Sequence, residues 1–262
     1  MIIEVKNLKK SFNGIVAVND ISFSVERGEI FAFLGPNGAG KTTTIKMLTT
    51  LLEPTSGDIY INGFDSKEKQ DEARKSFAIV FQDSSLDDEL TAYENMEFHG
   101  VLYSVSRKIL KKRIEELLRF VGLWDRREEF VKNFSGGMKR RLEVARGFIH
   151  LPKILFLDEP TLGLDPQTRN HIWDYIIKLN REKKMTIFFT THYMEEADRI
   201  SDKVAIIDKG VIVALGNPSN LREKTKTSSL DEAFLALTGK DMREEEVKAI
   251  DRMRIRRKVH RR

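Results

Sequence analysis

A glycine-rich loop near the start of the chain holds the residues whose types and spacing point most clearly to chemistry. The run GPNGAGKT fits the pattern GxxxxGK(S/T), follows the apolar run EIFAFL and precedes a helical pattern. Glycines at these positions let backbone N–H groups surround phosphates, while the Lys41 ammonium neutralises phosphate oxygens and the Thr42 hydroxyl binds Mg²⁺. The loop predicts a nucleotide site formed by Gly35, Pro36, Asn37, Gly38, Ala39, Gly40, Lys41, Thr42 and Thr43.

Two acidic residues end a second apolar run, ILFLDE. A magnesium ion on phosphates needs a carboxylate from a second strand, which makes Asp158 the candidate metal ligand. Successive side chains of a strand point to opposite sides, so Glu159 faces the other way. There it could orient or deprotonate an attacking water, and the alternative is a solvated surface acid.

Two further polar residues each follow a predicted strand. His192 ends the run TIFFTTH, and Gln82 ends SFAIVFQ. Ligands of an open α/β sheet bind beyond the carboxyl ends of its strands, which favours both as site residues. Neither is specific alone, because a single histidine is more often structural.

A second candidate anion site begins 94 residues after Lys41, at Ser135. The run FSGGMKRRLEVARG places Ser-Gly-Gly directly before a helical pattern. The first N–H groups of a helix have no partner, and the helix dipole is positive there, so such a start attracts anions. One chain therefore has two predicted phosphate-binding segments.

Strands that alternate with helices must position these residues. Apolar runs at 29–34, 76–82, 153–159 and 185–192 alternate with helical patterns, which predicts an α/β fold with a mainly parallel sheet. Strand patterns stop between about 87 and 144, where runs such as RKILKKRIEELLRFVGL are amphipathic with a helical period. This stretch predicts an inserted helical subdomain.

Composition limits the class of protein. The 262 residues are 40% hydrophobic and contain no Cys, which fits a reducing cytosol and excludes disulfides. No run of about 18 apolar residues is present, and the start lacks a signal peptide's apolar stretch, so a membrane role would need a partner. The net charge of +5 comes from the tail, because residues 251–262 alone carry +6. That tail is either a solvated end or a contact with acidic lipid headgroups.

From about Ile3 to Gly239 the sequence resembles the ATP-binding subunits of ABC transporters. The phosphate loop, Gln82, the FSGGM signature, LFLDEP, GLD at Gly163–Asp165, and His192 occur in the family's order and approximate spacing. The resemblance implies a P-loop NTPase core, an N-terminal antiparallel β-subdomain and an inserted all-helical subdomain. It also implies a domain at 1–239, followed by the basic tail at 240–262.

The resemblance implies ATP and Mg²⁺ as cofactors and a role for each motif. Two such domains pair head to tail, so that the signature of one chain binds the γ-phosphate of ATP on the other. The nucleotide would be held by the phosphate loop, by Phe12 stacked on adenine and by Ser135, Gly136 and Gly137 of the partner, with Asp165 at the dimer seam. Lys41, Gln82, Glu159 and His192 would be catalytic, with Glu159 as general base and His192 sensing the γ-phosphate, while Thr42, Gln82 and Asp158 would serve Mg²⁺. Core packing is the alternative for Phe12.

The signature departs from the family pattern at its two ends. The family usually begins it with Leu and ends it with Gln, whereas this chain has Phe134 and Met138. Because Ser-Gly-Gly is intact, the ATP sandwich is still expected. Any contact made by the family's Gln is put in question.

Two stretches, VFQDSSLDDELTAYENM and SSLDEAFLALTG, resemble the exporter branch of the family. The partners implied are a second ATPase subunit, identical or not, and a membrane permease, with the chain at the inner face of the cell membrane. We expect residues 81–98 to face the permease, and we hypothesise that Leu90, Tyr93 and Met96 form part of the groove, with subdomain core as the alternative.

The rival function is a soluble ABC-type ATPase that acts on nucleic acid or ribosomes. Such proteins carry a long coiled coil between loop and signature, or two cassettes in one chain. The 94 residues between Lys41 and Ser135 leave no room for a coiled coil, and the chain has one cassette. A non-hydrolysing module is a further alternative, but the presence of Asp158, Glu159 and His192 favours hydrolysis.

Overall fold

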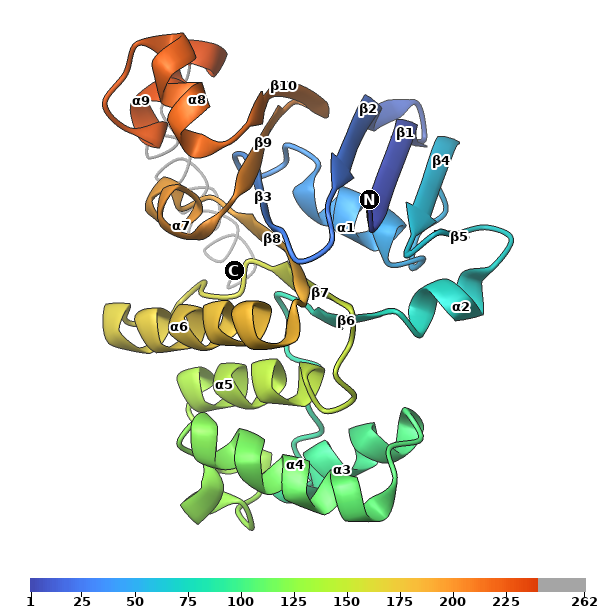
Figure 1. Ribbon diagram of the computed structural model, residues 1–262, viewed down its shortest axis with the longest axis vertical. Coiled ribbons are helices and arrows are strands. Elements are labelled where there is room, and N and C mark those ends of the chain that lie inside the picture. Colours follow the sequence, from blue (N-terminus) through green and yellow to red (C-terminus); the bar gives the residue numbers. More distant parts are fainter. Residues whose placement is uncertain (240–262) are drawn as a thin grey trace, which may run out of the picture.

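The computed structural model describes residues 1–239, and the basic tail predicted at 240–262 lies outside the described residues. Figure 1 shows two sheets on one side of the molecule and a group of helices at its far end. The larger sheet is mainly parallel, as the alternation of strands and helices predicts, and the smaller sheet is antiparallel, as the resemblance implies.

The larger sheet has six strands in the order β10-β9-β3-β8-β7-β6. Strands β9, β3, β8, β7 and β6 run parallel to one another, and β10 runs antiparallel to β9. Because β8 lies between β3 and β7, the carboxyl ends of these three strands meet at one edge. The strands are β3 (Ile30–Leu34), β6 (Phe77–Val80), β7 (Ile154–Asp158), β8 (Thr186–Thr191), β9 (Lys203–Asp208) and β10 (Val211–Gly216).

The smaller sheet is antiparallel, with the order β2-β1-β4-β5. Its strands are β1 (Ile3–Phe12), β2 (Ile15–Val25), β4 (Ser56–Ile61) and β5 (Phe64–Asp65). Asn62 and Gly63 both have positive φ in the turn between β4 and β5, as a tight hairpin requires. The predicted fold class, an α/β core with an N-terminal antiparallel subdomain, is confirmed.

Helices cover the larger sheet and build the far end of the molecule. Figure 1 shows α3, α4 and α5 together, with α6 beside α5, and α5 contacts β6 of the larger sheet. Two 3₁₀ turns, Trp124–Arg126 and Val131–Asn133, connect α4 to α5. The helices are α1 (Lys41–Leu48), α2 (Gln70–Arg74), α3 (Ala92–Leu102), α4 (Arg107–Phe120), α5 (Gly136–Gly147), α6 (Pro166–Lys183), α7 (Met194–Ile200), α8 (Pro218–Thr225) and α9 (Leu230–Thr238).

The core has two parts, one on each face of the larger sheet. In β3, Ile30, Ala32 and Leu34 join the part beneath the helices, while Phe31 and Phe33 join the part shared with α1 and the smaller sheet. All five side chains are buried, as expected for a central parallel strand covered on both faces. The strand is thereby fixed in register, which fixes the loop that follows it.

Among residues 1–239, no helix combines the length and the apolar character needed to cross a membrane.

Candidate active site

The loop between β3 and α1 has a backbone path that requires glycine at two positions. A Cβ at Gly35 would lie 2.3 Å from the Ile207 carbonyl oxygen, so no side chain fits there. Gly40 has a φ of 109°, and a Cβ there would lie 2.7 Å from the Ala17 carbonyl oxygen. Both the backbone conformation and the lack of space therefore exclude other residues. Gly40 also caps α1 without a side chain, so the first N–H groups of this helix face the loop.

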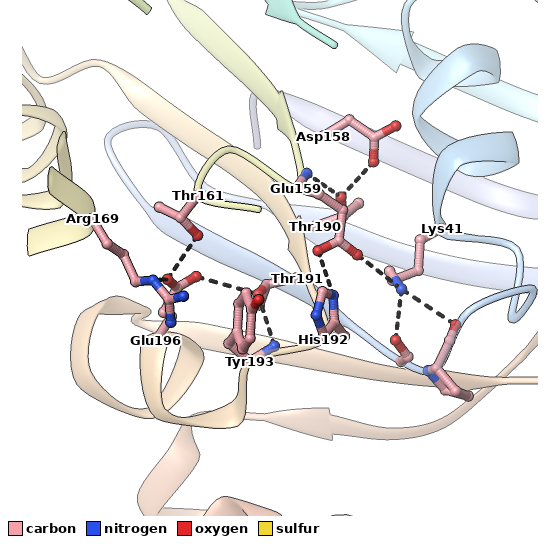
Figure 2. A network of polar contacts seen from close by, with 12 residues as sticks. Lys41, Asp158, Glu159, Thr161, Arg169, Thr190, Thr191, His192, Tyr193 and Glu196 are labelled. Carbon is pink, nitrogen blue, oxygen red and sulfur yellow. Dashed lines mark hydrogen bonds and ion pairs between the residues drawn. The ribbon is translucent and has the colours of Figure 1, made fainter. Parts of the chain in front are cut away.

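The Lys41 ammonium lies within this loop and contacts the end of β7. Nζ donates to the carbonyl oxygens of Gly35 at 2.7 Å and Pro36 at 3.3 Å, and lies 3.1 Å from Oε1 of Glu159 (Figure 2). The side chains of Lys41 and Glu159 are each 6% exposed. The cation is thus held where phosphate oxygens would meet it.

Glu159 is shared between Lys41 and His192. Its second carboxylate oxygen, Oε2, lies 2.7 Å from Nδ1 of His192. Burial alone would raise the pKa of Glu159, but the hydrogen bond with His192 and the charge of Lys41 lower it below its usual value. Glu159 also has a φ of 50°, a left-handed conformation that is uncommon for a residue with a side chain. The protein thus keeps this carboxylate ionised, as a general base must be.

Thr190, at the end of β8, connects the two acidic residues. Its hydroxyl accepts a hydrogen bond from the backbone N–H of Glu159 at 3.0 Å and donates to Oδ1 of Asp158 at 2.6 Å. Asp158 is buried at the end of β7, where it is paired with Thr190 of the neighbouring strand β8. Sequence reasoning missed Thr190, since a threonine within a strand carries no specific signal.

A cavity of about 150 Å³ lies between the loop, Gln82 and Glu159, and Asp158 and His192 do not line it. Lys41, Thr42, Gln82 and Glu159 line it together with Ala17, Pro36, Asn37, Gly38, Gly40 and Thr43. Gln82 follows β6 and reaches the cavity from the opposite side of β7. Its lining does not include Phe12, Ser135 or Asp165.

The oxygen ligands near this cavity fit Mg²⁺ bound to a nucleotide. Thr42 supplies a hydroxyl, Gln82 an amide oxygen and Asp158 a carboxylate, the hard donors that this ion prefers. Among the described residues, no group of three or more His, Cys, Asp or Glu could hold a metal ion. A magnesium ion here would therefore need phosphate oxygens to complete its shell.

A further buried carboxylate, Glu196 on α7, supports the segments on either side of the site (Figure 2). Oε1 accepts from the Thr161 hydroxyl at 2.7 Å, Oε2 accepts from the Thr191 hydroxyl at 3.3 Å, and Arg169 of α6 lies 3.5 Å away. Glu196 thus ties the residue before His192 to the segment that follows Glu159. The sequence marks Glu196 only as one acid in a helical run.

Ser135 caps α5, and its hydroxyl accepts from the backbone N–H of Met138 at 3.3 Å. Ser135 and Gly136 are exposed and Gly137 is half-buried. A Cβ at Gly136 would meet nothing within 4 Å, and one at Gly137 would come only within 3.8 Å of Leu164. Neither glycine has a positive φ, so the fold of this chain requires neither.

The two departures from the family signature both pack on Arg126. The Arg126 guanidinium lies 5.6 Å from the Phe134 ring centre, and its Nη1 lies 3.2 Å from the Met138 sulfur. Phe134 and Met138 are buried. The Met138 side chain therefore contacts Arg126, a residue of its own helical subdomain.

Phe12 and Asp165 are both exposed and do not line the cavity. Phe12 is 44% exposed, with the Lys10 ammonium 5.1 Å from its ring centre, so it is not a core residue. Asp165 is exposed and caps α6, where Oδ1 accepts from the Thr168 N–H at 3.0 Å. Hydrogen bonds from Thr168 lower the pKa of Asp165.

The predicted groove residues divide between surface and core. Met96 is fully buried, so its place in the proposed groove is wrong and the core alternative holds, while Leu90 and Tyr93 are half-buried. The exposed apolar residues of α3 lie on another face. They are Phe98, Val101 and Leu102, which are 62%, 59% and 63% exposed.

Comparison with known proteins identifies close relatives over most of the chain. The family described as ABC transporter matches residues 18–162. The linearmycin resistance ATP-binding protein LnrL of Bacillus subtilis (strain 168) is 40% identical over 241 residues, which cover 89% of this chain and 77% of LnrL. The daunorubicin/doxorubicin resistance ATP-binding protein DrrA of Streptomyces peucetius is 40% identical over 228 residues, which cover 87% of this chain and 69% of DrrA.

Solved structures share the fold. An ATP-binding subunit of an ABC transporter superposes with a TM-score of 0.85 and 33% identity, over 91% of this chain and all of the other. A dimeric ATP-binding cassette in a post-hydrolysis state, bound to ADP and Pi, superposes with a TM-score of 0.76 and 27% identity, over 82% of this chain and 98% of the other.

Proposed function

Because this chain belongs to the ABC transporter family and is an ATPase subunit that energises a membrane transporter, we propose that its two anion-binding segments serve different ATP sites of a head-to-tail dimer. In this arrangement the loop at 35–43 binds one ATP, and Ser135, Gly136 and Gly137 bind the ATP on the partner subunit. Residues 1–239 would form the ATP-binding domain.

The observation that carries this proposal is the open space around Gly136 and Gly137. A side chain at either position would meet no close contact within this chain, and neither backbone conformation needs glycine. The two glycines therefore suit the approach of something outside the chain. A helix start with an exposed serine hydroxyl and free N–H groups suits a phosphate.

Residues in and beside the cavity then have separate tasks in hydrolysis. Lys41 neutralises phosphate charge, and Glu159, ionised by its contacts with Lys41 and His192, accepts a proton from the attacking water. His192 orients Glu159 and responds to the γ-phosphate. Thr42, Gln82 and Asp158 would hold Mg²⁺, which neutralises phosphate charge when bound.

The partner permease would dock on α3. Phe98, Val101 and Leu102 are spaced three and four residues apart, so they form one exposed apolar face. Exposed apolar patches on otherwise polar surfaces mark contact sites. LnrL and DrrA are resistance proteins by name, and with this support we propose that the permease exports a compound to which it confers resistance and holds the chain at the inner face of the membrane.

Mixing two inactive variants tests the shared ATP sites. Lys41→Ala disables the loop, and Gly137→Asp disables the signature by adding charge where the chain has room for a side chain. In a mixed dimer, one site combines the intact loop of the Gly137→Asp chain with the intact signature of the Lys41→Ala chain.

We expect each variant alone to be inactive and the mixture to recover up to about a quarter of the native ATPase rate. That figure assumes equal mixing, where half of the dimers are mixed and each has one of two sites. A mixture as inactive as its components would refute the shared site.

A further inference from the structure

Arg140 lies on α5, in the basic run KRR, and is only 7% exposed. Its Nε donates to the Pro160 carbonyl oxygen at 2.7 Å, and Nη2 donates to the carbonyl oxygens of Asp158 and Glu159, each at 3.1 Å. Nη1 donates to the carbonyl oxygen of Phe81, the residue before Gln82. One guanidinium thus contacts the backbone on both sides of the active site.

Glu143, one turn further along α5, completes this arrangement. Its Oε2 lies 3.3 Å from Nη1 of Arg140, and its Oε1 accepts from the backbone N–H of Ser85 at 2.7 Å. Glu143 is also buried. The pair therefore ties α5 to the end of β7 and to both ends of the 81–85 segment.

The geometry uses the full hydrogen-bonding capacity of arginine. A guanidinium has five N–H donors in a rigid plane, and Arg140 has five acceptors, four carbonyl oxygens and one carboxylate. Buried donors without acceptors are costly, so a movement of α5 relative to β7 must carry these carbonyls along or break several bonds. The backbone that moves includes Glu159.

We propose that Arg140 is a positioning residue that makes the placement of Glu159 and Gln82 follow the position of α5. This inference rests on the proposed function, in which the start of α5 binds the ATP of the partner subunit. Ser135 and Arg140 lie on one helix, five residues apart. The helix that presents the signature to the partner's ATP thus also holds the backbone of the catalytic carboxylate of its own chain.

Arg140→Lys keeps the positive charge but removes the planar guanidinium with its five donors, so it tests positioning. We expect ATP to bind this variant within about twofold of the native affinity, while kcat falls at least tenfold. The control is Lys139→Met. Lys139 lies on the same helix and forms an ion pair with Asp88, and its loss should leave the native kcat unchanged. If Arg140→Lys lowers the melting temperature strongly, Arg140→Met with Glu143→Leu removes both buried charges together and should fold. A native kcat in whichever variant folds would overturn the proposal.

The mixed dimer distinguishes positioning of Glu159 from support of the signature. Its one intact site uses Glu159 of the Gly137→Asp chain and the signature of the Lys41→Ala chain. Adding Arg140→Lys to the Gly137→Asp chain should remove most of the recovered ATPase rate, and adding it to the Lys41→Ala chain should remove much less. Equal or reversed losses would overturn the proposal. A mixture without recovered activity before Arg140 is changed would instead refute the shared site.

Discussion

Nζ of Lys41 and Oε1 of Glu159 lie 3.1 Å apart, and both side chains are almost fully buried. Lys41 begins α1, directly after the loop that follows β3, and Glu159 follows β7. In the sheet, β8 separates these two strands. The ion pair spans the site, so substitution of one residue changes the environment of the other.

Replacing Glu159 with glutamine should separate binding from hydrolysis. The amide cannot accept a proton from water, so we expect the ATPase rate to fall by about 10²- to 10⁴-fold, the usual contribution of a general base. ATP should still bind, and an ATP-bound dimer should accumulate in size-exclusion chromatography. A variant that hydrolyses ATP at the native rate would show that another group is the base.

Replacing Lys41 with alanine should abolish measurable ATP binding and lower stability. Loss of one partner leaves a buried carboxylate, at a cost of about 3 kcal/mol in the free energy of unfolding. Lys46→Ala, at an exposed position of the same helix, should change neither quantity. Lys41→Ala with Glu159→Gln should regain stability without regaining affinity. Unaltered nucleotide binding by Lys41→Ala would contradict the role assigned to the loop.

Acid should destabilise the protein through a pair of histidines outside the site. His99 and His150 both contact the Tyr103 ring, with centres 4.9 and 3.7 Å away. Burial lowers the pKa of each to about 4, and repulsion by Arg146 and Arg113 adds to the effect. The unfolded chain binds these protons near the ordinary histidine pKa of about 6.5. Stability is therefore full above that pH and falls as the pH drops toward 4.

Urea unfolding at several pH values between 4.5 and 7.5 measures this loss. We expect His99→Phe with His150→Phe, which keeps rings at both positions, to flatten the dependence. His171→Gln changes an exposed histidine on α6 and should leave the native dependence in place. A double variant as acid-sensitive as the native protein would exclude the pair as its cause.

Charge placed on α3 should detach the permease without affecting ATP. We expect Phe98→Asp with Leu102→Asp to lower the amount of permease that co-purifies by about tenfold or more, a loss of at least about 1.4 kcal/mol of binding. Leu235→Asp alters an exposed leucine on α9 and is the matched control. Equal recovery of permease with both variants would place the contact elsewhere.

The sequence predicts well those features that follow from the order of neighbouring residues along the chain. Gly35, Asp158 and His192 each follow an apolar strand, and parallel strands bring their carboxyl ends to one edge, so their meeting follows from pattern alone. The turn at Asn62-Gly63 is likewise a local property.

The sequence predicts poorly the direction in which a helical side chain points. Met96 and Phe98 are both apolar residues of α3, yet one is buried and the other exposed. Arg140 looks like its basic neighbours, and only the approach of β7 and the 81–85 segment makes it a buried residue. Such differences arise when elements distant in sequence pack together, which a local pattern does not contain.

The strand order of the larger sheet has a consequence for synthesis of the chain. β3 ends at residue 34, but it pairs with β8 and β9, which begin at residues 186 and 203. While the chain emerges from the ribosome, the strand that leads to the phosphate loop has none of these pairing partners until most of the protein has been translated. An unpaired apolar strand is prone to aggregate, so a nascent chain of this length depends on being shielded until β8 appears.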